Sequence, residues 1–352
     1  MKKDKYFGLA TIFCTSVFLY AQSIPPKYPK EERVIAFYNL ENCYDTIDDP
    51  LTTDEEFTPL GNRHYTAEIM RHKLSNLSRV ISELGPTGRE YPPDLLGVAE
   101  VENSAVLQEL VRLPLLARAR YRIIHHESPD PRGIDVALLY QSTSFQPLEH
   151  RPLSVSLPGG TKQVRFTRDI LYVKGLLDED TFHILVNHWP SRRGGEVRSA
   201  PARMAAAKIC RHFIDSLESV HPHSAIIVMG DLNDDPDSRS IVRWLGASGK
   251  REDDGNNILF NPWVAFYQKG IGTLANKDRW GLFDQILFSR SLLFSGKKSW
   301  YWGRADICRK PYLSENQGRF KGYPMRTWDG NRYRGGFSDH FPTYITLIKK
   351  AG

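Results

Sequence analysis

The sequence is poor in cysteine. Only four of its 352 residues are cysteines, and three of them, Cys43, Cys210 and Cys308, lie beyond the first 21 residues. Three cysteines are too few for the disulfide framework of a small secreted domain, although one bridge between two of them stays open. The core must therefore come from apolar packing, for which a 41% hydrophobic composition is sufficient.

The chain also lacks a Gly/Ser-rich or Pro-rich linker, an internal repeat and any low-complexity tract. Without a linker nothing marks a boundary between domains, and without a repeat the solenoid architectures are excluded. A length of 352 residues could hold two domains, but large α/β folds often use that length as one. We therefore expect a single domain over residues 22–352.

A long apolar run is missing too, and this decides how the N-terminus is interpreted. Three lysines among the first five residues precede an apolar run of 15 residues, Tyr6–Tyr20, and small Ala21 stands before polar Gln22. So short a run predicts a cleaved signal peptide over residues 1–21, with an uncleaved anchor as the alternative. We expect a protein exported to the periplasm or the cell exterior, with no stable membrane anchor after cleavage.

What the sequence does contain is a series of strand patterns. Nine apolar runs bounded by turn residues predict buried strands: RVIAFYNL, DLLGVAEV, YRIIHH, IDVALLY, DILYVKGLL, FHILVNHW, AIIVMGD, FDQILFS and FPTYITLI. Apolar residues at helical spacing predict helices over Tyr65–Leu84 and Ala200–Leu217. Nine strands with few long helices exceed a single doubly wound sheet. We therefore expect an α+β fold of two packed sheets with helices outside.

Acids, amides and histidines gather at the ends of six of these strands. They are Asn39, Glu41, Glu100, His188, Asp231, Asn233, Asp284, Asp339 and His340. Each alone has a structural explanation, because Asp and Asn are common turn and cap residues. Six such strand ends in one chain indicate a functional site, since α/β and sandwich folds build their sites at strand ends.

The motifs at these positions resemble the endonuclease/exonuclease/phosphatase superfamily. The resemblance runs from about Arg33 to Ile348 and rests on NLEN, GVAEVEN, VNHW, GDLN, the strand that begins at Asp284, and SDH. It implies a DNase I-like four-layer α/β/β/α sandwich of two mixed β-sheets flanked by helices, and Mg²⁺-dependent hydrolysis of a phosphate ester. The first three motifs are more similar to secreted bacterial nucleases than to cytoplasmic repair enzymes.

By this resemblance, four residues hold the metal. Glu100 is the principal ligand, Asn39 lies beside it, and Asp339 and Glu41 contribute further oxygens. Carboxylate and amide oxygens suit a hard cation, so we expect Mg²⁺, with Mn²⁺ or Ca²⁺ as alternatives.

Five other residues carry the expected catalysis. Asp231 would orient or deprotonate the attacking water, while neutral Asn233 holds a phosphate oxygen without repelling it. His340 should be charged and contact the phosphate, with Asp284 fixing its ring and raising its pKa. The resemblance makes His188 a phosphate binder or a proton donor to the leaving group.

Neighbouring polar residues are given no catalytic role. Asp234 and Asp235, which follow GDLN, are expected to be solvated turn and helix-start residues. The other histidines of the sequence have no motif support, among them His64, His72, His125, His126, His221 and His223.

Positive charge is concentrated in one segment. Residues 22–352 hold 44 Lys and Arg and 40 Asp and Glu, a net charge of +4, whereas Lys297–Gly336, hereafter the basic segment, carries +7 by itself and interleaves it with eight aromatic residues. Cations for phosphates and aromatic faces for bases are what nucleic-acid contact needs; the alternative is an irregular loop packed by its aromatics. The substrate-binding residues we expect are Arg192, Arg193, Arg326, Arg332 and Arg334.

Together these features predict a monomeric, secreted, metal-dependent phosphoesterase, with nuclease activity on DNA or RNA as the first choice. The alternative is a phosphatase or phosphodiesterase that acts on inositol phosphates, phospholipid head groups or another small phosphate ester. A non-catalytic polyanion-binding protein is least favoured, because such a protein has no need for paired carboxylates and histidines at strand ends.

Overall fold

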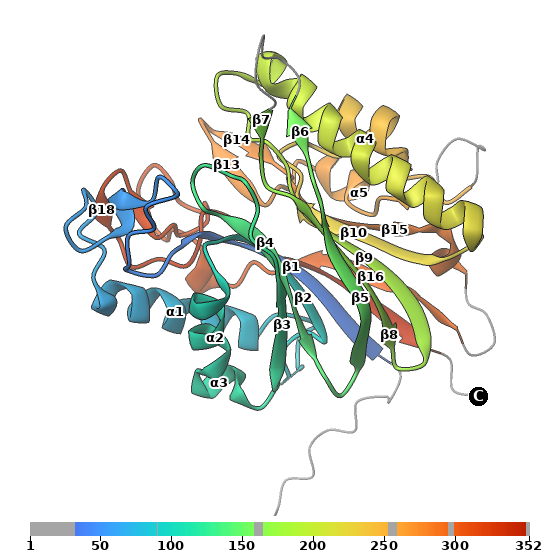
Figure 1. Ribbon diagram of the computed structural model, residues 1–352, viewed down its shortest axis with the longest axis horizontal. Helices are drawn as coiled ribbons and strands as arrows, with labels where there is room; N and C mark the ends of the chain where they lie inside the picture. The colour runs from blue at the N-terminus through green and yellow to red at the C-terminus, as the bar shows by residue number, and fades with distance from the viewer. Residues whose placement is uncertain (1–31, 90, 158–164, 253–258, 295–298, 350–352) are drawn as a thin grey trace, which may run out of the picture. The chain divides into compact units, whose positions relative to one another are not determined.

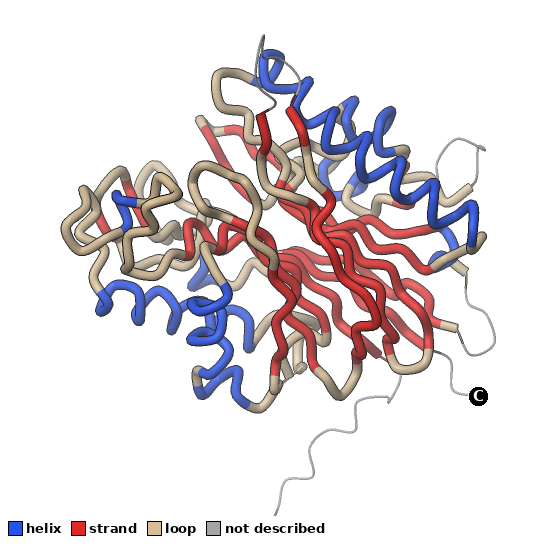
Figure 2. The backbone as a smooth tube through the Cα atoms, viewed as in Figure 1, coloured by secondary structure: helices blue, strands red, loops and turns tan. Residues whose placement is uncertain are grey.

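Two β-sheets face each other at the centre of the fold, and helices cover their outer faces (Figures 1 and 2). The computed structural model describes residues 32–89, 91–157, 165–252, 259–294 and 299–349. The expected signal peptide, residues 1–21, lies outside the described residues.

The first sheet has the strand order β16-β19-β1-β2-β4-β3. Its only parallel pair is β1–β2, among the strands that the structure describes. Helices α1, α2 and α3 lie on its outer side (Figure 1). The elements are β1 Glu32–Cys43, α1 Ala67–Ser82, β2 Leu95–Val101, α2 Ser104–Arg112, α3 Pro114–Ala117, β3 Tyr121–His125, β4 Asp135–Gln141, β16 Trp300–Ile307 and β19 Thr343–Lys349.

The second sheet has the strand order β11-β12-β15-β10-β9-β8-β5 and is also mixed, because β9–β10 and β11–β12 are parallel. Helix α4 crosses its outer side, with the π-helical turn η2 beside it. The elements are β5 Phe145–Leu153, β8 Ile170–Leu177, β9 Asp180–His188, α4 Glu196–Val220, β10 Ala225–Asp231, η2 Ser240–Leu245, β11 Ala247–Ser248, β12 Leu259–Phe260 and β15 Asp284–Ser289.

Short elements connect these layers. They are η1 Glu55–Phe57, β6 Ser156–Leu157, β7 Arg165–Phe166, α5 Val264–Tyr267, β13 Leu274–Asn276, β14 Arg279–Gly281, η3 Arg290–Leu293, η4 Pro311–Leu313, β17 Trp328–Asp329 and β18 Arg332–Tyr333. Of the helices in the described part of the chain, none is long and apolar enough to cross a lipid bilayer.

The continuous apolar runs of the sequence follow from burial of the strands on both faces. In β10, Ile227 and Met229 point into the core between the sheets, whereas Ile226 and Val228 point into the core beneath α4. Successive side chains of a strand alternate between its faces, so a strand covered on both sides needs apolar residues at every position. The expected four-layer α/β/β/α sandwich is confirmed.

Two glycines, one in β2 and one in β10, allow close approaches between strands. A Cβ at Gly97 of β2 would lie 2.5 Å from Sδ of Met229 on the facing sheet, and one at Gly230 would lie 2.2 Å from the backbone oxygen of Asn187 on β9. Met229 can move its flexible side chain, but the backbone of Asn187 cannot yield as easily. Gly230 therefore fixes how closely β10 and β9 approach just before Asp231.

We predict that Gly230→Ala lowers the free energy of unfolding by about 1–3 kcal/mol, the usual cost of overpacking a core. The reason is the contact of the added methyl group with the Asn187 backbone. The measurement is urea unfolding followed by circular dichroism, with Ala225→Gly at the start of β10 as a comparison at the far end of the strand. An unchanged unfolding midpoint for Gly230→Ala would contradict the prediction.

All nine expected strands are present, and the two expected helices correspond to α1 and α4. In the two large sheets the sequence patterns missed β5, β16 and the two-residue strands β11 and β12, and outside these sheets they missed the short strands β6, β7, β13, β14, β17 and β18. β5 contains Pro147 and Pro152 and is largely exposed, as suits a strand at the sheet edge, and β16 is interrupted by Gly303. The cysteine bridge left open above does not form: Cys43, Cys210 and Cys308 are free and buried.

Candidate active site

The strand topology brings the predicted site residues to one edge of the sandwich. β1 and β2 are parallel, as are β9 and β10, so each pair ends at the same edge of its sheet. β15 and β19 run antiparallel to β10 and β1 and therefore begin at that edge. Asp284 at the start of β15 is the register partner of Asp231 at the end of β10.

Asp231 is the centre of this cluster. One carboxylate oxygen accepts a hydrogen bond from Nδ2 of Asn39 at 3.1 Å, and the other accepts one from the backbone N–H of Asn233 at 3.0 Å. The Nε2 atoms of His188 and His340 lie 3.6 and 4.0 Å from its Oδ2. Burial raises the pKa of Asp231 to about 7; the positive charge of His340 opposes this, and the negative charge of Asp284 adds to it.

His340 and Asp284 form a buried pair. Nδ1 of His340 lies 2.7 Å from Oδ2 of Asp284, which is fully buried. Burial disfavours the charged imidazolium, but the charge and hydrogen bond of Asp284, together with Asp231 and Asp339, raise the pKa of His340 well above its usual value. The ring is therefore charged at neutral pH and presents Nε2 toward Asp231 and Asp339.

Glu100 and Glu41 are aimed by irregular backbone. The pairing of β1 with β2 is in register at Asn39 and resumes at Cys43, so a bulge lies between them. Glu41 and Glu100 have positive φ angles of 48° and 59°, a region that costs energy for any residue with a Cβ. Bulges re-aim side chains next to active sites, and the backbone N–H of Asn42 donates to Oε2 of Glu100 at 2.9 Å.

Glu41 also fastens the basic segment to the first sheet. Its Oε2 accepts a hydrogen bond from the backbone N–H of Thr327 at 2.7 Å, while the Thr327 hydroxyl is 2.9 Å from Nζ of Lys73. Burial and the nearby charge of Asp339 raise the pKa of Glu41 to about 7 despite the opposing charge of Lys73. Sequence inspection could not find Lys73, because a single lysine in a helix normally faces solvent.

His188, at the end of β9, lies between Glu100 and Asp231. Its Nε2 is 3.8 Å from Glu100 Oε1 and 3.6 Å from Asp231 Oδ2. Burial, and then repulsion by Arg168 and Arg132, lower the pKa of His188 well below its usual value, so the ring is neutral. Arg168, a second residue that the sequence did not single out, is held by Asp130 at 2.9 Å.

The donor set at this edge fits a hard divalent cation. Burial and then repulsion by Asp339 raise the pKa of Glu41. Burial raises the pKa of Asp231, the charge of His340 opposes this, and repulsion by Asp284 and Glu100 adds to it. Oε1 of Glu100 is beyond hydrogen-bond distance from His188 and points into the same cluster. Oxygen ligands with surplus negative charge are what Mg²⁺, Mn²⁺ or Ca²⁺ require. Glu100, Asp339, Asn39 and Glu41 are the residues that the sequence analysis predicts would hold it. Among the described residues, the acids and histidine at this edge whose ligand atoms lie within 4.8 Å of one another are Asp231, Asp284 and His340.

The turn after β10 differs from the expectation. Asp234 and Asp235 are buried rather than solvated. Oδ1 of Asp234 lies 2.7 Å from Nε of fully buried Arg203, and Arg192 lies 3.2 Å from Asp234 and 3.0 Å from Asp235. Nε of Arg192 also donates to the backbone oxygen of Asn233. The two acids and two arginines therefore hold Asn233, which has a φ of 50°, in place beside Asp231.

The expected substrate-binding arginines occupy different settings. Arg193 and Arg332 are exposed. Arg326 forms an ion pair with Asp339 at 2.8 Å, and Arg334 forms one with Glu315 at 2.9 Å. Arg192 is engaged in the turn described above. Four of the five, all but Arg192, are therefore exposed, although Arg326 and Arg334 are also paired with acids of the protein.

Many aromatic residues of the basic segment are packed inside the fold. Trp328 contacts Phe57 and Tyr65 with ring centroids 6.4 and 6.0 Å apart, and Trp302 contacts Phe260 at 5.4 Å. Phe320 differs, since 49% of it is exposed. Core packing therefore explains buried Trp328 and partly buried Trp302, but it does not explain the exposed ring of Phe320.

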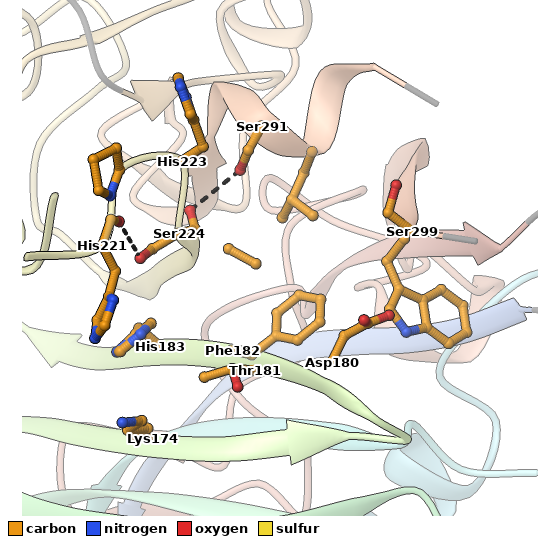
Figure 3. A pocket seen from close by; sticks show the side chains of 14 residues that line it. Lys174, Asp180, Thr181, Phe182, His183, His221, His223, Ser224, Ser291 and Ser299 are labelled. Carbon is orange, nitrogen blue, oxygen red and sulfur yellow. Dashed lines mark hydrogen bonds between the residues drawn. The ribbon is translucent and has the colours of Figure 1, made fainter. Parts of the chain in front are cut away.

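A separate cavity of about 540 Å³ lies at the opposite end of the second sheet (Figure 3). Lys174 and His183 enter it from β8 and β9, and His221 and His223 from the loop after α4. Its residues on β9 come from the start of the strand, whereas His188 ends it. His221 and His223, which the sequence left without a role, are therefore remote from the strand-end cluster.

The fold and the cluster define a phosphoester hydrolase built on a four-layer sandwich. The chain belongs to the Endonuclease/Exonuclease/phosphatase family, whose model matches residues 34–349. Enzymes of this family hydrolyse phosphoester bonds and usually use a divalent metal. No curated protein matches the chain in sequence.

Solved structures share the fold at low sequence identity. An endonuclease/exonuclease/phosphatase family protein from Bacteroides thetaiotaomicron has a TM-score of 0.54 and 14% identity, covering 91% of this chain and 99% of its own. TDP2 from D. rerio in complex with a single-strand DNA product has a TM-score of 0.53 and 15% identity, covering 90% and 98%. The human Nocturnin catalytic domain with bound sulfate has a TM-score of 0.52 and 15% identity, covering 91% and 95%.

Proposed function

We propose that the protein is an exported, divalent-metal-dependent phosphodiesterase that cleaves nucleic acid. The observation that carries the proposal is the convergence on Asp231 of Asn39, His188, Asn233 and the His340–Asp284 pair, all within 4.0 Å. A buried carboxylate among hydrogen-bond donors, beside a charged histidine, suits in-line attack of water on a phosphate diester.

In this proposal each group has one task. Asp231, with a pKa near 7, accepts the proton of the attacking water. The charged His340 and the amide of Asn233 donate hydrogen bonds to the phosphoryl oxygens. The neutral ring of His188 donates a hydrogen bond from its N–H to the leaving oxygen. A bound Mg²⁺ would neutralise phosphoryl charge and assist the departing alkoxide.

Nucleic acid is the favoured substrate for two reasons. The basic segment ends directly before Asp339 and His340, and Arg193 and Arg332 leave exposed charge available for phosphate contacts. In addition, a fold relative, D. rerio TDP2, was solved with a single-strand DNA product. The deciding experiment offers the purified protein plasmid DNA, RNA, sphingomyelin and inositol polyphosphates in parallel, with Mg²⁺ or with EDTA. Cleavage only of a lipid or inositol phosphate would replace the nuclease proposal by the small-ester alternative.

We predict that Arg193→Ala combined with Arg332→Ala weakens DNA binding and flattens its salt dependence by about two units of log-log slope, roughly one for each duplex phosphate contact. These two arginines are chosen because substitution of Arg326 or Arg334 would also remove the ion-pair partner of Asp339 or Glu315. The measurement is the Michaelis constant on DNA between 50 and 200 mM salt, conditions where such contacts differ most.

The control for this prediction is Lys174→Ala, which removes a cation at the remote cavity. Hydrolysis of a small soluble diester should change little in either variant, because it lacks flanking phosphates. If the salt dependence of the double variant equals that of the wild type, Arg193 and Arg332 are exposed to solvent and do not contact DNA phosphates.

Export is proposed from residues 1–21, which lie outside the described residues. The expected result is that protein recovered outside the cytoplasm begins at Gln22. Recovery with an intact N-terminus would favour the uncleaved anchor instead.

A further inference from the structure

A pocket of about 510 Å³ opens beside the catalytic cluster. It lies between the β13–β14 hairpin and the basic segment, and Asp339 forms part of its wall. Because Oδ1 of Asp339 is 3.9 Å from Nε2 of His340, a group in this pocket would adjoin the reacting phosphate. The volume lies within the range typical of small-ligand sites.

The charges of this pocket are nearly balanced, because Lys277 and three arginines face Glu315, Asp329 and Asp339 across its wall. Its arginines are already matched by acids: Arg319 with Asp278 at 3.4 Å, Arg326 with Asp339 at 2.8 Å, and Arg334 with Glu315 at 2.9 Å. Asp329 adds a further carboxylate to the lining. A second phosphate group would gain little in this space, because the carboxylates offset most of the positive charge of the lining. A neutral group with hydrogen-bonding edges fits better.

An aromatic surface is available for such a group. Phe320 lines the pocket with 49% of its surface exposed. Its ring rests on Tyr323 at 5.5 Å, Tyr323 contacts Trp280 at 5.6 Å, and Trp280 stacks on Phe341 at 6.3 Å. The Tyr323 hydroxyl donates to Asp278 at 2.8 Å, which fixes the ring that supports Phe320. This row of rings runs from the pocket to the neighbour of His340.

We propose that this pocket receives one nucleoside adjoining the scissile phosphate, with its base against Phe320. The inference rests on the proposed function and deepens it: recognition would combine the phosphate site with a single stacked base, as every base offers a π-face. Asn276, Lys277 and Asp329 supply hydrogen-bonding groups around the ring. Inositol polyphosphates lack the aromatic group, and their charges would gain little in this pocket.

The experiment uses short single-stranded oligonucleotides in which one phosphodiester is cleavable and the other links are methylphosphonates. Two analogues lack the base on the 5′ or the 3′ side of that bond. For the wild type, loss of the base on one side should lower kcat/KM by roughly tenfold to a hundredfold, the usual effect of one base-aromatic stack. Phe320→Ala should lower kcat/KM on the intact substrate by the same factor. On the analogue that is the poorer substrate for the wild type, this variant should show no further loss of kcat/KM. Phe320→Tyr should retain the wild-type kcat/KM on both substrates.

The matched control is Phe294→Ala, an exposed phenylalanine that follows η3 near the remote cavity and should leave kcat/KM unchanged. Wild-type kinetics for Phe320→Ala, or indifference of the wild type to base loss on both sides, would overturn the pocket assignment while leaving nuclease activity intact. If the wild type cleaves no nucleic acid, the proposed function fails. Titration with an uncleavable, fully methylphosphonate oligonucleotide then tests separately whether the pocket binds a nucleoside. Binding that Phe320→Ala abolishes would support the pocket assignment, and absence of binding would overturn it.

Discussion

Replacing Glu100 with glutamine is expected to lower turnover by roughly a hundredfold or more, since a bound cation contributes several kcal/mol of transition-state stabilisation. Glu100 is the carboxylate of β2 that the bulge aims into the cluster, and its Oε1 is beyond hydrogen-bond distance from His188. Glutamine retains an oxygen for the N–H of Asn42 but loses the charge that holds a hard cation. The fold should survive, because a repulsive charge is removed from near Asp231.

The measurement is the initial rate of hydrolysis at saturating Mg²⁺, with thermal melting as the check on folding. Glu102→Gln is a matched control two residues away. Burial raises the pKa of Glu102 to about 8, so this side chain is largely protonated at neutral pH and glutamine resembles it closely. Full activity of Glu100→Gln, or wild-type turnover in EDTA, would contradict a metal site at Glu100.

Removing His340 is expected to lower kcat by roughly a hundredfold to a thousandfold, the usual cost of losing one hydrogen-bond donor to the charge that develops in the transition state. Asp284 acts through His340, to which it is bonded at 2.7 Å. The double variant His340→Ala with Asp284→Ala should therefore be little less active than His340→Ala alone, because groups that serve one step are strongly non-additive. The single His340→Ala variant should be the less stable of the two, since it leaves the fully buried Asp284 unpaired.

The pH dependence of the rate in a more conservative variant, Asp284→Asn, tests the same His340–Asp284 pair. Asp284→Asn removes the charge that raises the pKa of His340, so the pKa of the ring falls. Activity that needs the charged ring is lost as pH rises through this pKa, and the alkaline limb of the rate profile should therefore move to lower pH. His221→Ala, at the remote cavity, is the control. Fully multiplicative losses in the double variant, with an unmoved alkaline limb, would show that His340 and Asp284 are not coupled.

Much of the fold could be predicted because its strands are buried on both faces. The run AIIVMGD is apolar at every position from Ala225 to Met229, and this property survives whatever the neighbouring strands are. β5 was not predicted, because it is not buried on both faces. It lies at the edge of its sheet, is largely exposed and contains two prolines, so neither its apolar content nor its propensity marks it as a strand.

The turn after β10 shows where local interpretation fails. Asp234 and Asp235 have the composition of a solvated turn, and nothing local distinguishes them from one. Their burial depends on Arg203 from α4 and on Arg192 before it, which are more than 30 residues distant in sequence. Ion pairs between residues so far apart in sequence can be identified only from the tertiary structure.

The sequence by itself determined the nine central strands, the residue types at their ends and the concentration of positive charge before the last strand, because each depends on a short stretch of chain. Only the tertiary structure decided how these residues act together. The parallel pairs β1–β2 and β9–β10 bring separate strand ends to one edge, and backbone bulges aim Glu41 and Glu100 into it. The basic segment likewise became a pocket wall with paired arginines and an exposed Phe320, because Asp278, Asp339 and Trp280, which contact it, come from elsewhere in the chain.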